Sequence, residues 1–129
     1  MRNKEASALV VDNDVKNIRE LTKILYNTRL FEMVFQALNY SEAVFILRKR
    51  NIHLLLIEIL LPGRNGIELL RTIRDSRYNA ETIMLYGQPN NYYRNLCISL
   101  GASCFFEKTE NLNKIGDIAT QLILNQKNI

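Results

Sequence analysis

Long apolar runs are missing from this 129-residue sequence, and cysteine is scarce. No apolar run approaches the ~20 residues that a membrane span needs. The first five residues lead into only a short apolar run, so we expect neither a membrane span nor a secretory signal. Cys97 and Cys104 lack the spacing of metal ligands and have no histidine near them in the sequence. They predict reduced thiols in a cytoplasmic protein.

Runs of like charge are also absent, although the chain is mildly basic. The formal net charge is +4, and the only short basic cluster, residues 48–50, falls where we expect a helix to end. Cations at that position complement the helix dipole, so we predict no nucleic-acid partner. Apolar residues make up 47% of the sequence and charged residues 23%, which is typical of a soluble globular domain. Without a repeat or linker, residues 1–129 are expected to form one domain, with no further domain in this chain.

The stretch from residue 52 to residue 68 organises the rest of the prediction. Leu54–Ile57 is an apolar run too short for a lone helix, and it predicts a strand buried on both faces. One carboxylate, Glu58, follows the run directly. A Pro-Gly turn at Gly63 comes next, and Asn65, with a glutamate three residues later, predicts a capping box that starts a helix. A buried strand therefore delivers one acidic side chain to its carboxyl end.

The remaining elements alternate in the same way along the whole chain. Each expected strand is followed by an amphipathic helix, which argues for a parallel sheet with helices on both faces. We expect an α/β fold of the flavodoxin-like, doubly wound type, with five strands in the order 2-1-3-4-5. The expected strands cover residues 6–11, 31–37, 54–57, 82–86 and 103–106, and the expected helices begin near Asp14, Ser41, Asn65, Asn91 and Leu112.

Charged and polar side chains follow four of these strands. In a parallel sheet the carboxyl ends of the strands share one edge, so the residues there should lie together. Carboxylates opposite a lysine suit a divalent cation and a phosphoryl group. An ion-pair network with no further function is the other interpretation, and both stay open. The residues placed at this edge are Asp12, Asn13, Asp14, Glu58, Tyr86 and Lys108.

Four segments resemble one family, in matching order and spacing. They are LVVDND (residues 9–14), LLLIEILLPGRNG (54–66), TIMLYG (82–87) and GASCFFEKT (101–109). Along essentially its whole length the chain resembles a bacterial response-regulator receiver domain of a two-component phosphorelay system. The resemblance implies a phosphorylatable aspartate after the third strand and an acidic pair after the first that holds magnesium. It also implies a small hydroxyl residue after the fourth strand, an aromatic switch residue in the fifth, and a lysine that contacts the phosphoryl group.

The chain departs from this pattern at three of those positions. Glu58 stands at the phosphoacceptor position, Asn13 replaces the second acidic residue, and Tyr86 replaces the small hydroxyl residue. Phe105 falls at the switch position, and Lys108 matches the family lysine.

Each departure weakens phosphoryl transfer. Glutamate reaches about 1.5 Å further than aspartate, and a ~1 Å misplacement can cost on the order of a hundredfold in rate. Asn13 removes a charge from a magnesium site whose remaining candidate ligands are Asp12 and Glu58, so magnesium binding is in doubt. Tyr86 holds its hydroxyl a ring's length from the backbone. Ordinary aspartyl phosphorylation is therefore not expected.

Three functions follow from the resemblance and the departures. The leading one is a pseudo-receiver, not an enzyme, in which Glu58 pairs with Lys108 and signalling runs through protein contacts. The second is a competent receiver that still takes a phosphoryl group from a histidine kinase. The third is a flavin- or nucleotide-binding domain on the same topology, which the lack of a glycine-, serine- and threonine-rich phosphate cradle disfavours.

The fourth helix opens with two adjacent tyrosines. Tyr92 and Tyr93 cannot both face the core at helical spacing, so one should be exposed. With Arg94, Phe105 and Phe106, and with the last helix, they are expected to form the surface that similar receivers use to dimerise or dock partners. The expected partner is a histidine kinase, a downstream effector or a second copy of this chain. A single solvated tyrosine is the alternative.

Overall fold

The computed structural model describes residues 6–127, without the side chain of the last of them. The five residues on which the expectation of no secretory signal rests lie outside this part. The strands are β1 (Ala6–Val11), β2 (Phe31–Ala37), β3 (Leu54–Glu58), β4 (Glu81–Tyr86) and β5 (Cys104–Glu107). The helices are α1 (Val15–Asn27), α2 (Tyr40–Lys49), α3 (Gly66–Asp75), α4 (Asn91–Ser99) and α5 (Lys114–Lys127).

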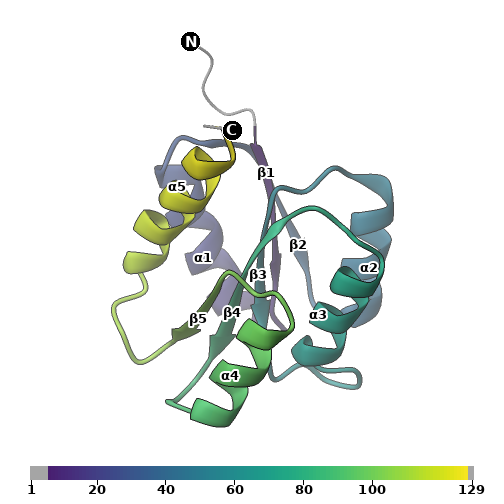
Figure 1. The fold of residues 1–129 in the computed structure, drawn as a ribbon. Coiled ribbons are helices and arrows are strands. Elements are labelled where there is room, and N and C mark those ends of the chain that lie inside the picture. The colour runs from purple at the N-terminus through teal and green to yellow at the C-terminus, as the bar shows by residue number, and fades with distance from the viewer. Residues whose placement is uncertain (1–5, 128–129) are drawn as a thin grey trace.

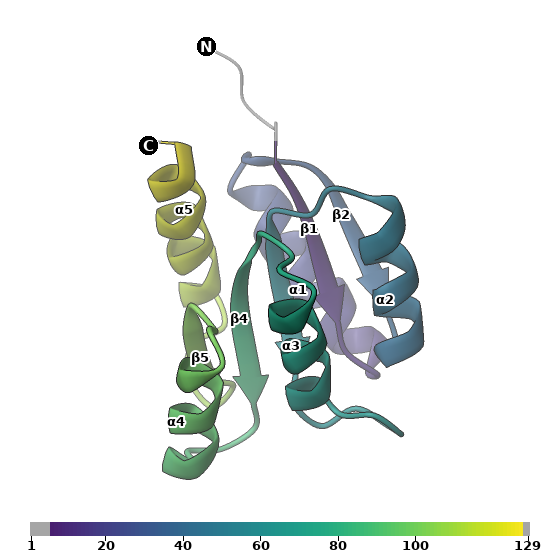
Figure 2. The ribbon, with the colours of Figure 1, turned by 45° about the vertical axis from the view of Figure 1, so that its right-hand side comes forward.

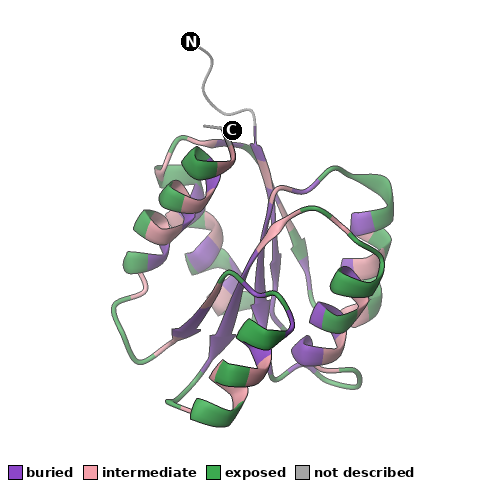
Figure 3. Ribbon diagram, in the orientation of Figure 1, coloured by how far each residue is buried: buried purple, intermediate pink, exposed green. Residues whose placement is uncertain are grey.

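All five strands are parallel and lie in the order β2-β1-β3-β4-β5 (Figure 1), so the predicted fold and strand order are confirmed. Helices α1 and α5 cover one face of the sheet, and α2, α3 and α4 cover the other (Figure 2). Every residue of β3 is buried, because this central strand is covered on both faces (Figure 3). Two separate apolar cores result, one on each face of the sheet.

Two helix starts follow local capping chemistry. The side chain of Asp14 accepts a hydrogen bond from the backbone N–H of Lys16, at 2.9 Å, and begins α1 as predicted. The side chain of Asn65 accepts from the N–H of Glu68, also at 2.9 Å, and begins α3. The reciprocal half of the predicted capping box is not formed among the described residues, because the Glu68 carboxylate pairs with Arg64 at 3.2 Å instead.

The predicted start of α2 is wrong by two residues. Asn39, and not Ser41, is the N-cap, since its side chain accepts from the N–H of Glu42 at 2.9 Å. Asparagine caps helices as well as serine does, and here it comes earlier in the chain.

Boundaries near the C-terminus also move by one or two residues. Strand β5 begins one residue later than predicted, and α5 begins at Lys114 because a turn at Asn111 precedes it.

Glycines have specific roles at three positions of the fold. Gly63 and Gly101 adopt the left-handed φ of +72° and +98° that their predicted turn positions favour. Gly66 has a different role, since a Cβ there would lie 2.3 Å from the backbone oxygen of Glu58. The start of α3 therefore packs directly on the end of β3 and holds the backbone of Glu58 in place.

Two further sequence expectations concern cysteine and membranes. Cys97 and Cys104 are free thiols, and burial raises the pKa of Cys97 to about 11. Among the described residues, none of the helices has the length and apolar character required to cross a membrane.

Candidate functional site

Three side chains from three strand ends meet at the carboxyl edge of the sheet. Glu58 ends β3, Asp12 follows β1 and Lys108 follows β5. Glu58 and Asp12 are both buried, with only 5% of the surface of Glu58 and 1% of that of Asp12 exposed. The Lys108 Nζ forms an ion pair with Glu58 Oε1 and a second one with Asp12 Oδ2, at 3.3 Å. The structure thus brings together Glu58 and Lys108, which the sequence predicts to pair, and it adds Asp12 as a second partner of the lysine.

The backbone places Lys108 for this double contact. Its N–H donates to the carbonyl oxygen of Tyr86 at 2.8 Å and so extends the pairing of β4 with β5. Burial by itself lowers the pKa of Lys108, but the hydrogen bonds and negative charges of Glu58 and Asp12 outweigh it and raise that pKa above its ordinary 10.5. Lys108 therefore keeps its positive charge at neutral pH.

The carboxylate oxygens that do not face the lysine also have donors. Glu58 Oε2 accepts from the N–H of Leu60, and Asp12 Oδ1 accepts from the N–H of Asp14, each at 2.9 Å. Asn17 Nδ2 makes a long contact of 3.5 Å to Asp12 Oδ2. All four carboxylate oxygens have a donor, so this site is a satisfied ion-pair network.

The other two residues of the predicted acidic pocket are not buried with Glu58. Asn13 and Asp14 are both exposed. The Asp14 carboxylate caps α1 through the N–H of Lys16, which agrees with the role that the sequence assigns to it. Only Asp12 of the three residues contributes a buried oxygen to the site.

The residues at this edge fit a divalent cation poorly. Magnesium prefers six oxygen ligands in octahedral geometry and substantial negative charge. Here Asp12, Glu58 and Lys108 sum to a formal charge of −1, and the lysine ammonium already contacts both carboxylates. Within the part of the chain that the structure describes, no group of three or more histidine, cysteine or acidic residues could hold a metal ion.

Aromatic rings connect this edge to α4. Tyr86 is buried, and its ring meets that of Tyr93 edge-on, with centroids 5.0 Å apart. The ring of Phe105 lies 6.5 Å from that of Tyr86 and is also buried. The guanidinium of Arg94 covers Phe105 at 5.0 Å and pairs with Glu107 at 2.9 Å. Tyr86 and Phe105 thus form one packed unit with the first turn of α4.

The predicted interaction surface is only partly at the surface. Tyr92 is 71% exposed while Tyr93 is half-buried, so one of the two tyrosines faces solvent as expected. The expectation that Phe106 contributes to this surface is wrong. Neighbouring residues of a strand point to opposite faces of the sheet, and Phe106 is buried in the core under α1 and α5.

Sequence reasoning missed the contacts that complete the site. The Leu60 N–H that holds Glu58 is a backbone group, and no residue type signals it. Asn17 lies on α1, five residues beyond Asp12, and no sequence pattern links the two residues.

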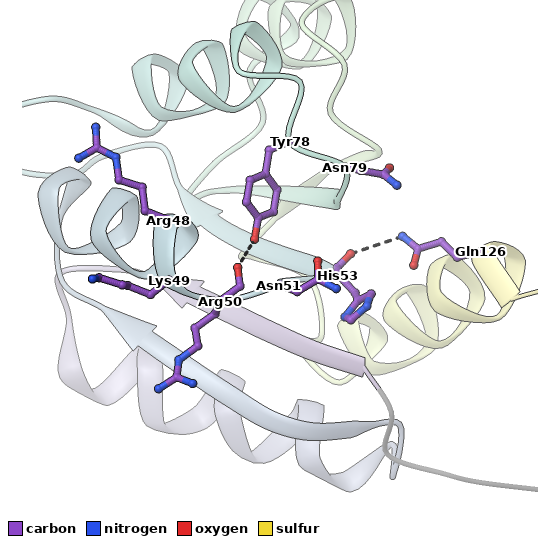
Figure 4. A pocket seen from close by; sticks show the side chains of 8 residues that line it. All are labelled: Arg48, Lys49, Arg50, Asn51, His53, Tyr78, Asn79 and Gln126. Atoms are coloured by element: carbon purple, nitrogen blue, oxygen red, sulfur yellow. Dashed lines mark hydrogen bonds between the residues drawn. The ribbon is translucent and has the colours of Figure 1, made fainter.

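Cavities occur at the opposite, amino edge of the sheet. One of about 440 Å³ is lined by Arg48, Lys49, Arg50, Asn51, His53, Tyr78, Asn79 and Gln126. The three basic side chains of its lining point in different directions (Figure 4), so they do not converge on an anion. The hydroxyl of Tyr78 is used structurally, since it donates to the carbonyl oxygen of Arg50 at 2.6 Å and accepts from the N–H of Ile52 at 2.9 Å.

Comparisons with known proteins agree with the geometry. Residues 8–120 match the family described as Response regulator receiver domain. The chain is 27% identical over 110 residues to a putative transcriptional regulator of Pseudomonas aeruginosa, covering 85% of this chain and 53% of that protein. It is 25% identical over 109 residues to the DNA-binding transcriptional activator EvgA of Escherichia coli, covering 84% of this chain and 53% of EvgA. The chain therefore spans about half the length of the curated relatives it matches.

A solved structure shows the same fold. The receiver domain of the Francisella response regulator 1452 superposes with a TM-score of 0.85 at 19% sequence identity, covering 95% of this chain and 99% of that one.

Proposed function

The chain belongs to the response regulator receiver domain family of two-component systems, and from this premise we propose that it signals without phosphorylation. In this proposal the Glu58–Lys108 ion pair holds the domain in one state, and signalling runs through protein contacts in the cytoplasm rather than through catalysis. Phosphoryl transfer needs the shorter reach of an aspartate at position 58 and a negative charge for magnesium at position 13, and Glu58 and Asn13 do not supply them.

One observation supports the proposal above the others. The Lys108 ammonium already pairs with the two buried carboxylates. This ammonium is the positive charge that an incoming phosphoryl group would need to contact. Glu58 carries one negative charge, against about −1.5 to −2 for a phosphorylated side chain by analogy with phosphoserine. Glu58 is therefore a partial and permanent mimic of the phosphorylated state.

The aromatic packing supports a fixed output surface. Tyr86 fills the space beside Phe105 and Tyr93, where the family pattern has a small hydroxyl residue. With that space occupied, Phe105 is packed inward, and the contact between Tyr86 and Tyr93 holds the first turn of α4 in a single position. We propose that the exposed Tyr92 and the Arg94–Glu107 pair on this face contact the partner.

The partner is proposed to be a protein: a histidine kinase, a downstream effector or a second copy of this chain. EvgA is named as DNA-binding, but the chain covers only about half of its length. Nucleic-acid binding is therefore not part of the proposal.

Acetyl phosphate with magnesium, followed by intact mass spectrometry, tests the proposal. We expect the wild-type chain to gain no phosphoryl group. The matched control is the triple variant Asn13→Asp, Glu58→Asp and Tyr86→Thr, which restores the family residues and is expected to be phosphorylated. A stoichiometric, base-labile phosphoryl adduct on the wild-type chain would instead establish the competent-receiver alternative.

A further inference from the structure

The two edge strands of the sheet differ in length and therefore in how exposed their backbones are to pairing. Strand β5 forms one edge and has four residues, whereas β2 forms the other and has seven. An edge strand leaves one row of backbone N–H and C=O groups unpaired, and another chain can pair with that row unless the strand is short, charged, bulged or covered. Strand β2 has the sequence FEMVFQA, with one charged residue, Glu32, and neither lysine nor proline. Its protection has to come from its shape or from a neighbouring element.

The hydrogen bonds of β2 show which of its backbone groups face outward. The carbonyl oxygen of Ala37 accepts from the N–H of Asp12, which follows β1, so the backbone of Ala37 faces the sheet. The N–H and C=O groups of successive strand residues point to alternate sides, and the backbone of Val34 and of Gln36 therefore faces away from β1. A register shift at the start of the β1–β2 pairing makes Glu32 an extra, bulged residue. The regular part of the outer edge is therefore the part of β2 beyond this bulge.

Side chains of α1 bond to this outer edge. The Tyr26 hydroxyl accepts from the outward-facing N–H of Val34 at 3.0 Å and donates to the sulfur of Met33 at 3.7 Å. Further along the strand, the side-chain amide of Gln36 donates to the Thr22 hydroxyl at 3.1 Å. Tyr26 is 41% exposed, so little packing holds its side chain over the strand. The hydrogen bond from Val34 to Tyr26 thus covers a backbone donor that neither charge nor proline protects.

The regular part of the outer edge is complementary to a second copy of itself. In an antiparallel pair of two copies centred on Phe35, Val34 of one copy lies opposite Gln36 of the other. The outward N–H and C=O groups of these two residues then form reciprocal hydrogen bonds. The same register places the two Phe35 side chains opposite each other and Met33 opposite Ala37, so apolar side chains meet and no like charges do. The bulge lies outside this register and does not interrupt it.

We propose that the outer edge of β2 is a pairing site for a second copy of this chain, which the Tyr26 hydroxyl blocks. The Val34 N–H that Tyr26 binds is one of the donors that the pairing needs, so Tyr26 and the second strand compete for the same group. When the Tyr26 side chain turns away, the two sheets can join through their β2 strands. This surface lies at the edge of the sheet opposite to β5, and it is independent of the Glu58–Lys108 pair and of the function proposed for it.

Sedimentation velocity of the whole chain and of its Tyr26→Phe variant tests the proposal. The variant keeps the ring but removes the hydroxyl, so the Val34 N–H has no partner in the single chain and gains one in the pair. We expect the self-association constant to rise by at least about tenfold. Equal association of the variant and the wild-type chain would overturn the proposal.

Tyr78→Phe is the matched control for this variant. The Tyr78 hydroxyl also accepts from a backbone N–H, that of Ile52 at 2.9 Å, but Ile52 lies before the central strand β3 and not on an edge. Its loss should leave self-association at the wild-type level. If Tyr78→Phe strengthens association as much as Tyr26→Phe does, the effect is a general loss of stability and the proposal is wrong.

Hydrogen exchange of single amides locates the contact. In Tyr26→Phe the amides of Val34 and Gln36 should exchange more slowly as the protein concentration rises, because only the pair protects them. Adding Gln36→Pro to this variant removes one outward N–H without touching the bonds to β1, and it should return association to the wild-type level. If the double variant does not fold, exchange at Gln36 in Tyr26→Phe alone decides. Exchange there that does not depend on concentration, or association that persists in a folded double variant, would refute the pairing.

Discussion

Replacing Lys108 by alanine leaves two buried carboxylates without their cation. The ammonium pairs with both Glu58 and Asp12, and no other Lys or Arg side chain among the described residues forms an ion pair with either. Removing one partner of a buried ion pair costs about 3–5 kcal/mol, because the remaining charge stays buried and unpaired. The Lys108 side chain is 21% exposed, so water can reach part of the gap. We therefore expect a loss at the lower end of that range, about 3 kcal/mol.

Such a loss is a large fraction of the stability of an ordinary domain, which is about 5–15 kcal/mol. Urea denaturation at pH 7 measures it directly as a lower midpoint with an unchanged m-value. The matched control is Lys114→Ala, which breaks an exposed ion pair with Glu110, at 3.1 Å, and should cost less than about 1 kcal/mol.

A rescue experiment separates charge from packing. The double variant Glu58→Leu with Lys108→Met removes both the cation and one buried carboxylate, and it should recover much of the stability that Lys108→Ala loses. If Lys108→Ala costs no more than Lys114→Ala, the ion pair does not hold the site together. A receiver locked by this ion pair would then have no physical basis.

Three further predictions use other parts of the structure. Gly66→Ala should destabilise the protein by about 2–4 kcal/mol, because the new Cβ would lie 2.3 Å from the backbone oxygen of Glu58, whereas Gly87→Ala meets nothing within 4 Å and should be nearly neutral in the same urea assay. The pKa of Lys108 is raised above 10.5, so the stabilisation by its ion pairs is fully present below that pH and is lost as the pH rises through the folded-state pKa. Stability measured from pH 9 to pH 12 should therefore fall more steeply for the wild-type chain than for Lys108→Met, and parallel curves would contradict this. Tyr92→Ala should change stability by less than about 0.5 kcal/mol, since the side chain is exposed, but should weaken partner binding or self-association measured by sedimentation. Unchanged association would place the interface elsewhere.

Much of the fold was accessible from the sequence because the decisive signals are local. The apolar run at residues 6–11 and the loose alternation at residues 31–37 predicted β1 and β2 with the same boundaries that the structure has. Asp14 and Asn65 cap their helices through hydrogen bonds to residues two and three positions later, which is a distance that a sequence pattern can capture. Strict alternation of strands and helices then leaves few topologies, and the predicted order of the strands is the observed one. The presence of Glu58 at the end of a buried strand follows from the same reasoning.

Tertiary structure decided how the side chains are used. Lys108 reaches Asp12 across 96 residues of sequence as well as Glu58, and only the sheet geometry sets that double contact. Phe106 is buried because β5 turns it toward α5, and the amino-acid type alone does not say which face a residue takes. The sequence determines which elements form, because their signals span a few residues, whereas burial and pairing depend on residues that only folding brings together.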